Sequence, residues 1–150
     1  MSNDREQFDP KSVPADGLPH VRVGIGGSEA RMVDVGDKPS TRRRALARAR
    51  VEFPPGLCEQ VMAGDGPKGP IEEVARSAGI LAAKGTGGLI PMCHPLGLDH
   101  VEISFEVAGP DNLDVLCRTS CEGRTGVEME AMVGAALAAL TVYDMTKGLD

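Results

Sequence analysis

This sequence contains few aromatic side chains. It has no tryptophan, one tyrosine and three phenylalanines, so aromatic residues make up 3% of its 150 residues. Hydrophobic residues nevertheless reach 41%, an ordinary value for a soluble globular protein. A chain of this length forms one domain that buries roughly two-thirds of its unfolded surface. We therefore expect an aliphatic core of Val, Leu, Ile, Ala and Met.

Positive charge and long apolar runs are also lacking. Sixteen basic and 22 acidic side chains give a net charge of −6, which argues against general binding of nucleic acid or anionic membranes. The longest apolar stretch lies within residues 131–142 and is too short to span a bilayer, and residues 1–10 contain no hydrophobic signal segment. We expect a cytoplasmic protein without a nucleic-acid or membrane partner.

Cysteine pairs with the spacing of metal ligands are absent. The four cysteines form no C-x-x-C pair and have no histidines at matching distances, whereas zinc sites need such spacing. We expect no bound metal and four reduced thiols, at Cys58, Cys93, Cys117 and Cys121.

The N-terminal part of the chain is polar and broken by proline and glycine. We expect residues 1–18 to be a flexible tail and residues 19–150 to form a single α+β catalytic domain. Residues 21–25 and 32–35 resemble two strands around a tight turn. Apolar residues alternate with larger polar ones in residues 44–53, which predicts a strand.

Helical periodicity and a hairpin pattern follow. We expect a short helix over residues 55–63, a helix over 71–84, and an antiparallel hairpin of residues 101–107 and 113–117. A final helix follows Gly123. The expected apolar face of the second helix comprises Ile71, Val74, Ala75, Ala78 and Ala82, and that of the final helix Val133, Leu137 and Leu140.

Two loops separate these elements. Pro91 and Pro95 exclude a central strand from residues 89–96 and predict a shaped loop. The glycine-rich residues 84–88 before it predict a pliable loop that binds an anion or acts as a hinge.

The final helix carries charged residues at both ends. Glu130 lies near its start, and Asp144 and Lys147 lie near its end. Solvated helix ends with a routine i,i+3 ion pair are one interpretation. The other is that Lys147, oriented by Asp144, is a proton donor or a phosphate ligand. Because Glu130 and Asp144 are about 21 Å apart on a straight helix, a site that uses both must be shared between subunits.

Lys68 lies in a second glycine-rich segment. Residues 64–69 match G-x-G-x-x-G but follow a helix rather than a strand, so they do not indicate a dinucleotide-binding fold. The loop holds Lys68 just before a helix N-terminus, where free backbone N–H groups favour an anion. A solvated lysine is the alternative.

His94 and an arginine run are further candidates. His94 lies between Cys93 and Pro95 in the constrained loop, where it donates to a phosphate or shuttles protons, unless it is a core histidine bonded to the backbone. Cys93 has no activating base nearby in the sequence. Arg42, Arg43 and Arg44 would alternate across a strand, so at most two of them face a common ligand.

Five motifs taken together resemble the MoaC family of cyclic pyranopterin monophosphate synthases. Their order and spacing also fit, and the resemblance covers residues 20–148. The motifs are Met-Val-Asp-Val at 32–35, Lys-Gly at 68–69, Leu-Ile-Pro-Met-Cys-His-Pro-Leu at 89–96, Thr-Gly-Val-Glu-Met-Glu-Ala at 125–131 and Leu-Thr-Val-Tyr-Asp-Met at 140–145.

The resemblance implies a ferredoxin-like antiparallel sheet with helices packed on one face. It implies a homohexamer, a trimer of dimers, with active sites at subunit contacts. The implied reaction is that of a lyase of molybdenum cofactor biosynthesis, which converts a cyclised dihydro-GTP to cyclic pyranopterin monophosphate and diphosphate. No metal or other cofactor is implied.

The resemblance also assigns residues. Asp144 and Lys147 match the catalytic acid–base pair, and Lys68 matches a second essential lysine. The lysines and His94 would neutralise triphosphate charge and supply protons. The substrate-contacting segments are matched by Met92, Cys93, His94, Glu128, Met129 and Glu130.

The chain departs from the family pattern at several positions. Gly85 and Gly88 stand where relatives have a basic and an acidic residue, and Pro70 replaces a residue that caps a helix. Relatives also continue through another strand beyond the position of Asp150. A second hypothesis is therefore a catalytically weakened paralogue that serves as a nucleotide-phosphate-binding or structural subunit.

Overall fold

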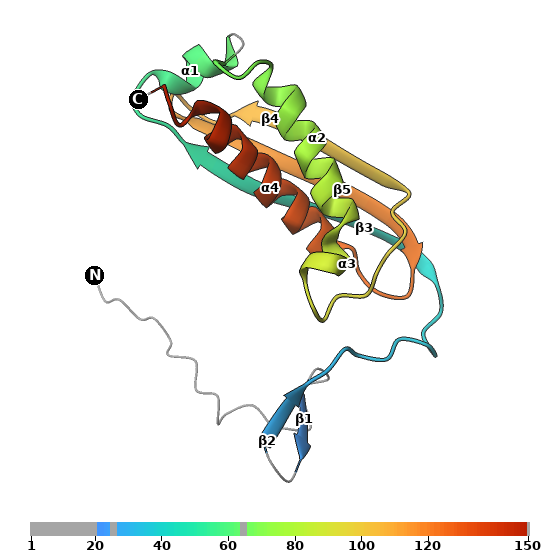
Figure 1. Ribbon diagram of the computed structural model, residues 1–150. Helices are drawn as coiled ribbons and strands as arrows, with labels where there is room; N and C mark the ends of the chain where they lie inside the picture. The colour runs from blue at the N-terminus through green and yellow to red at the C-terminus, as the bar shows by residue number, and fades with distance from the viewer. Residues whose placement is uncertain (1–20, 25–26, 64–65, 150) are drawn as a thin grey trace, which may run out of the picture. The chain divides into compact units, whose positions relative to one another are not determined.

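The computed structural model describes residues 21–24, 27–63 and 66–149 and divides the chain into two compact units, 1–34 and 35–150 (Figure 1). In the first unit, β1 (Val21–Gly24) pairs antiparallel with β2 (Gly27–Ala30). A hairpin is confirmed, but the strand predicted over residues 32–35 is wrong. The four pairs of the ladder run from Gly24 opposite Gly27 to Val21 opposite Ala30, so the second strand ends at Ala30, before residue 32. The predicted tail, residues 1–18, lies outside the described residues.

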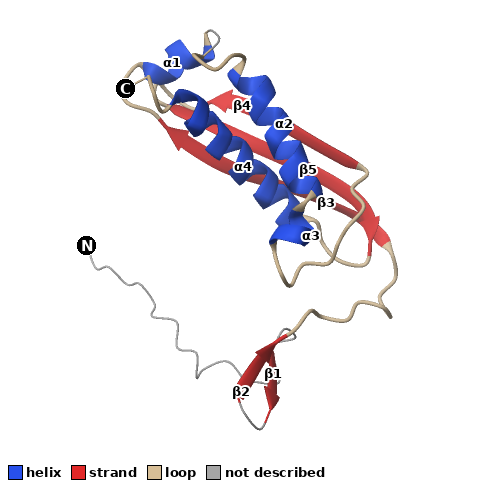
Figure 2. Cartoon of the chain, in the orientation of Figure 1, coloured by secondary structure: helices blue, strands red, loops and turns tan. Residues whose placement is uncertain are grey.

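The second unit is an α+β fold with a three-stranded antiparallel sheet in the order β3-β5-β4. Figure 2 shows α2 and α4 side by side across one face of this sheet. The β-α-β-β-α succession matches the first five elements of the ferredoxin-like β-α-β-β-α-β pattern, and the predicted α+β class is confirmed. The elements are β3 (Thr41–Glu52), α1 (Leu57–Met62), α2 (Ile71–Lys84), α3 (Thr86–Leu89), β4 (His100–Val107), β5 (Asn112–Gly123) and α4 (Glu128–Thr146).

Alternation along the strands separates the two faces of the sheet. In β3, Ala47 and Val51 pack toward the helices, whereas the arginines between them are exposed on the other face, called here the open face. On the open face, Asp114 of β5 accepts from Arg50 at 2.7 Å and from Arg48 at 3.3 Å. These guanidinium groups hold the pKa of Asp114 below its usual value, Arg50 having the larger effect.

Small residues let α2 approach α4 and the sheet closely. A Cβ at Gly79 would lie 2.9 Å from the Ala138 Cβ and 2.9 Å from the Gly134 carbonyl oxygen. A Cβ at Gly134 would lie 2.7 Å from the Cys117 Sγ of β5. The buried side of α4 is accordingly made mostly of alanine and glycine, including Ala131, Gly134, Ala135, Ala138 and Ala139.

The predicted core stripe of α4 is wrong. Leu137 and Leu140 are 36% and 58% exposed, and Val133 is only half-buried. α4 is apolar around most of its circumference, so periodicity could not select its inner face. The close approach of α2 and the sheet leaves room only for small side chains on the middle of that face, between Ala131 and Ala139, and the leucines point outward.

The predicted apolar face of α2 is correct in part. Ile71 and Ala75 are buried, and Ala78 and Ala82 are half-buried, but Val74 is 42% exposed. Gly79 and Ala83 complete the buried face instead. The reason is the same: where α2 packs closely against α4, at Gly79, there is room only for small side chains.

The segment before β4 contains no strand, as predicted from its prolines. The pliable loop predicted over residues 84–88 is wrong in part, because Thr86–Leu89 forms one helical turn. Hydrogen bonds from the Gly88 amide to the Gly85 carbonyl at 2.9 Å and from the Ile90 amide to the Thr86 carbonyl at 2.9 Å close this turn. Within the described residues, every helix is too short or too polar to cross a membrane.

The close packing at Gly79 gives a testable prediction with a definite sign. In an open helix Gly→Ala adds about 1 kcal/mol of stability, but here overpacking costs about 1–3 kcal/mol, so we expect Gly79→Ala to lower the free energy of unfolding. Urea denaturation measures it. Gly97→Ala is the control, since no atom lies within 4 Å of its added Cβ. A Gly79→Ala variant more stable than the parent would contradict the packing described here.

Candidate active site

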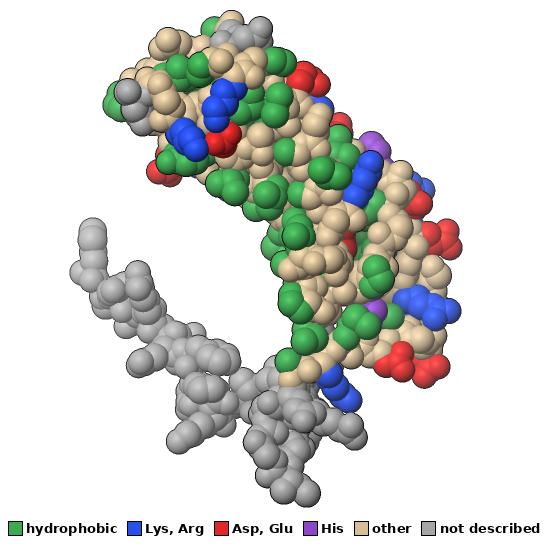
Figure 3. Space-filling model, viewed as in Figure 1, with side chains coloured by type: hydrophobic (Ala, Val, Ile, Leu, Met, Phe, Trp, Pro, Cys, Tyr) green, Lys and Arg blue, Asp and Glu red, His purple; other side chains and the backbone are tan. Residues whose placement is uncertain are grey.

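Three of the residues predicted from the sequence meet at the C-terminal end of α4. The Lys68 Nζ donates to the Asp144 Oδ2 at 2.8 Å and to the Asp144 backbone carbonyl at 2.9 Å. The Lys147 Nζ lies 2.8 Å from the other carboxylate oxygen of Asp144. All three side chains are about half exposed, and Figure 3 shows acidic atoms between two groups of basic atoms at this end of the molecule. We call these three residues the lysine–aspartate cluster.

A tight turn places Lys68 in this cluster. Gly66 and Gly69 exchange two backbone hydrogen bonds of 3.1 and 3.0 Å, with Pro67 and Lys68 at the tip. Proline suits the second position of such a turn because its φ is already fixed. Gly69 has a φ of 103°, which glycine adopts without strain, and a Cβ at Gly66 would lie 2.7 Å from the Ile71 side chain. The glycines therefore shape the turn and do not mark a dinucleotide site.

The two lysines make Asp144 a stronger acid than an ordinary aspartate. Hydrogen bonds from Lys147, and secondarily from Lys68, lower the pKa of Asp144 to about 2. In return, Asp144 raises the pKa of Lys147. At neutral pH the cluster therefore consists of one carboxylate between two ammonium groups, with a net charge of about +1.

A second group of predicted residues lies at the opposite end of α4. Glu130 is only 3% exposed, and within the described part of the chain its Oε2 has no hydrogen-bond partner. Burial raises the pKa of this carboxyl group, and the nearby charge of Glu128 adds to the effect. Glu130 lines a cavity of about 230 Å³ together with Lys84, Gly85, Gly87, Gly88, Pro95 and Leu96.

The loop that carries His94 joins this second group. Pro95 and Leu96 line the same cavity as Glu130, and a Cβ at Gly87 would lie 3.0 Å from the Pro95 Cα, so the loop packs on the α3 turn. Burial raises the pKa of the Cys93 thiol, as do the charges of Glu130 and Glu128. Cys93 is therefore a neutral thiol at neutral pH and not an activated nucleophile.

The remaining predicted residues flank this group. Glu128 is exposed and Met129 half-buried in the first turn of α4, while Met92 is 39% exposed in the loop. His94 is half-buried beside Cys93. We call Glu130, the cavity beside it and the residue 92–96 loop the buried-glutamate group.

The two groups do not meet within one chain. α4 is one uninterrupted helix from Glu128 to Thr146, and Glu130 and Asp144 are separated by about 21 Å along its axis. The structure thus places two groups of candidate residues at the two ends of one helix. This agrees with the separation inferred from the sequence.

One residue beside the buried-glutamate group was missed as an individual candidate. Lys84, the last residue of α2, lines the cavity of Glu130, although the sequence suggested only that it belonged to a pliable loop. Its place at the end of the predicted helix, directly before Gly85, was the available signal. Its charge can complement an anion or the buried carboxylate.

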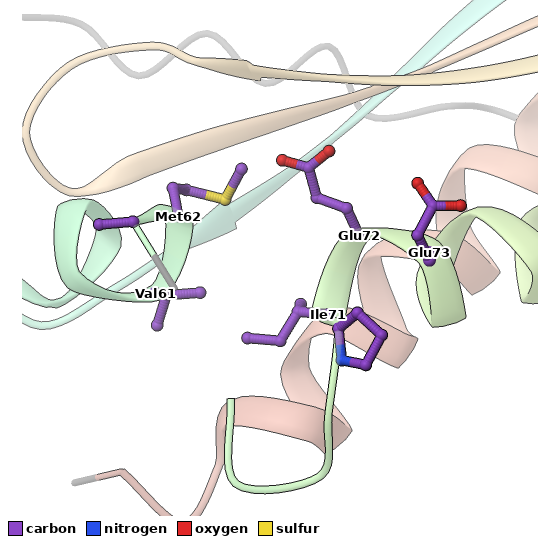
Figure 4. Close-up of a pocket in the computed structure, with 7 residues that line it drawn as sticks. Val61, Met62, Ile71, Glu72 and Glu73 are labelled. Carbon is purple, nitrogen blue, oxygen red and sulfur yellow. The ribbon is translucent and has the colours of Figure 1, made fainter. Parts of the chain in front are cut away.

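A larger hollow lies between α1 and α2 but does not coincide with either group. Figure 4 shows Val61 and Met62 of α1 across from Ile71 and Glu72 at the start of α2, around a cavity of about 400 Å³. Glu72 and Glu73 both pair with Arg76, at 3.4 and 3.3 Å. None of the predicted site residues lines this hollow.

The cysteines and metal-ligand residues support no further site. All four cysteines are free, and Cys58, Cys117 and Cys121 are buried. Over residues 21–24, 27–63 and 66–149, no group of three or more His, Cys, Asp or Glu side chains is arranged to hold a metal ion.

The fold and the two groups define an α+β protein with an acid–base cluster at one end of a helix and a buried carboxylate at the other. Residues 32–150 match the model of the MoaC family. The chain is 50% identical over 122 residues to the cyclic pyranopterin monophosphate synthase of Herpetosiphon aurantiacus, covering 81% of this chain and 74% of the relative. It is also 50% identical to cyclic pyranopterin monophosphate synthase 1 of Mycobacterium tuberculosis, over 81% of this chain and 71% of the relative.

A third relative agrees with these two. The cyclic pyranopterin monophosphate synthase of Chloroflexus aurantiacus is 50% identical over 122 residues, 81% of this chain and 75% of that protein. The chain belongs to the MoaC family.

The lowered pKa of Asp144 predicts a titration. Because the folded-state pKa of about 2 lies below the ordinary value of 3.8, the carboxylate stabilises the fold above pH 3.8, and this contribution is lost as pH falls through 2. We expect a midpoint near 2 for Asp144 by carbon-13 NMR, moving toward 3.8 in Lys147→Met. An unshifted midpoint in the parent protein would refute the ion-pair geometry.

Proposed function

We propose that this chain is a cyclic pyranopterin monophosphate synthase of molybdenum cofactor biosynthesis, the activity in the names of its relatives. The substrate would be a cyclised dihydro-GTP, and the products cyclic pyranopterin monophosphate and diphosphate. The reaction is that of a lyase, and we expect it to proceed in the cytoplasm without a metal or other cofactor. The observation that carries the proposal is the placement of Asp144 between Lys68 and Lys147.

The lysine–aspartate cluster suits an acid–base role on a phosphate-bearing substrate. Asp144 raises the pKa of Lys147, so this lysine enters the reaction protonated. We assign it the role of proton donor, which the resemblance implies. Lys68, held by both the carboxylate and the backbone carbonyl of Asp144, supplies a second positive charge. The two ammonium groups can stabilise negative charge that develops on the leaving diphosphate. Asp144 orients both lysines.

The buried-glutamate group suits recognition of the ring part of the substrate. The Glu130 Oε2 is buried without a partner among the described residues, and such an oxygen is costly unless a ligand supplies a donor. The N–H groups of a guanine-derived ring are donors of this kind. We assign Glu130 to ring binding, with Glu128, Met129, Met92, Cys93 and His94 as further contacts.

A second copy of the chain is needed to unite the two groups. The outer face of α4 carries large, exposed apolar side chains in a stripe that ends at Asp144 and Lys147: Met132, Leu137, Leu140 and Tyr143. Figure 3 shows hydrophobic side chains gathered in a band on this helix-bearing face. Exposed apolar patches of this kind mark protein interfaces.

The arrangement follows from the symmetry of a homodimer. If two α4 stripes pack antiparallel about a two-fold axis, the lysine–aspartate cluster of one chain lies near the buried-glutamate group of the other. Each dimer would then hold two complete sites. We propose such a dimer as the unit of the homohexamer that the resemblance implies.

Removal of either lysine is expected to abolish turnover. General acid–base groups contribute about 10²–10⁴-fold to rate, so Lys68→Ala and Lys147→Ala should each lose at least about 10²-fold. The assay is release of diphosphate and pterin from the cyclised dihydro-GTP, with solution mass to check assembly. Arg31→Ala, a change at an exposed cation of the first unit, is the control. Full activity in either lysine variant would contradict the assigned roles.

Disruption of the α4 stripe is expected to separate the subunits. Leu140→Asp places a charge in the proposed contact, and we expect it to lower both the solution mass and turnover while the helical signal in circular dichroism persists. Val107→Asp is the matched control, since Val107 is similarly exposed, at 52%, at the end of β4. An unchanged mass for Leu140→Asp would place the subunit contact elsewhere.

A further inference from the structure

A groove with a basic lining lies on the open face of the sheet, the face that α2 and α4 leave uncovered. Its volume is about 620 Å³, larger than that of the hollow between α1 and α2 or the cavity beside Glu130. Its lining includes Arg42, Arg44 and Leu46 of β3, Arg118 and Ser120 of β5, and His100 of β4. None of these residues belongs to the lysine–aspartate cluster or the buried-glutamate group.

The strand register explains how these side chains converge. Arg44 lies directly opposite Ser120, which in turn lies opposite His100, so these three residues form one row across the sheet. Arg42 is two residues away from Arg44 on the same face, at a spacing of about 7 Å. Arg43, between them, faces the other way and donates to the Gly123 carbonyl at 3.5 Å.

The next row of the register adds a third cation and an apolar surface. Leu46 lies opposite Arg118 and is 56% exposed. The apolar side chain therefore stands directly beside the arginines. A ligand in this groove would meet guanidinium groups along its length and an apolar surface beside Arg118.

Charge in this groove is only partly compensated. Among the described residues no Asp or Glu lines it and neither Arg42 nor Arg44 forms an ion pair, although Glu122 lies directly opposite Arg42 in the strand register. Arg118 pairs with Glu102 at 3.2 Å, but both side chains are more than half exposed. By contrast, Arg48 and Arg50, further along the same face, share an ion pair with Asp114. In a chain with a net charge of −6, this is a local positive site.

We propose that this groove binds the diphosphate group of a small molecule, as a second site apart from the proposed catalytic one. Guanidinium groups match phosphate oxygens in a bidentate fashion, and the spacing of Arg42 and Arg44 suits two adjacent phosphates better than one. The Ser120 hydroxyl between the arginine and His100 is a further donor. Leu46 offers contact area to an organic group attached to the diphosphate.

The groove can be tested without interference from the lysine–aspartate cluster. In a Lys68→Ala/Lys147→Ala background, titration calorimetry with inorganic diphosphate measures binding that does not depend on the lysine–aspartate cluster. We expect measurable binding, and we expect Arg42→Gln/Arg44→Gln in the same background to weaken it by about tenfold or more. Arg31→Gln is the matched control and should leave the affinity unchanged. Circular dichroism checks that each variant is folded.

Two further titrations distinguish a nucleotide diphosphate from free inorganic diphosphate as the ligand. If guanosine diphosphate binds more tightly than inorganic diphosphate and Leu46→Ala removes the difference, the ligand is a nucleotide. Equal affinities identify free diphosphate. Arg42→Lys/Arg44→Lys keeps the positive charge but loses the bidentate geometry of the guanidinium groups. We expect its affinity to lie between those of the unchanged groove and Arg42→Gln/Arg44→Gln.

Two results would overturn the proposal. One is binding that is absent in the Lys68→Ala/Lys147→Ala background, or present there but insensitive to Arg42→Gln/Arg44→Gln. The other is a change in solution mass caused by Arg42→Gln/Arg44→Gln in a protein that binds no diphosphate at the groove. The open face would then be a contact between subunits.

Discussion

The close approach of α2, α4 and the sheet at Gly79 and Gly134 determines much of what this molecule presents to its surroundings. A Cβ at either glycine would come within 3.0 Å of a neighbouring element. This spacing admits only small side chains to the middle of the inner face of α4, between Ala131 and Ala139, and it turns Leu137 and Leu140 toward solvent. The same uninterrupted helix fixes Glu130 at one end and Asp144 at the other. Core packing therefore sets both the proposed subunit contact and the positions of the two partial sites.

The two ends of α4 differ in their electrostatics, and the difference suits different parts of one substrate. Asp144 is half exposed, and Lys147 and Lys68 lower its pKa, so the C-terminal end of α4 holds three charged side chains that solvent can reach. Glu130 is buried, its pKa is raised, and its Oε2 lacks a partner among the described residues. A phosphate chain fits the first environment and the donor edge of a ring fits the second. Neither end alone offers both.

Much of the fold could be predicted from local patterns. Alternation in β3 and in the hairpin, and the bounds of α2, followed from periodicity, and Pro91 and Pro95 excluded a strand. The inner face of α4 could not be predicted, because an almost uniformly apolar helix carries no directional signal. The link between Lys68 and Asp144 is equally invisible to periodicity, since it joins residues 76 positions apart through a glycine turn. The resemblance to the family identified Lys68 and Asp144 as candidates, and only the structure shows that they are in contact.

The central claim is that one active site draws residues from two chains, and subunit mixing tests it most directly. Lys147→Ala damages one end of α4 and Glu130→Gln the other, so each variant alone should be inactive. After the two are unfolded and refolded together, half of the dimers are mixed and each has one intact site, so turnover should recover to roughly a quarter of the parent value. A mixture as inactive as its components, with mixed dimers verified by mass, would contradict a shared site.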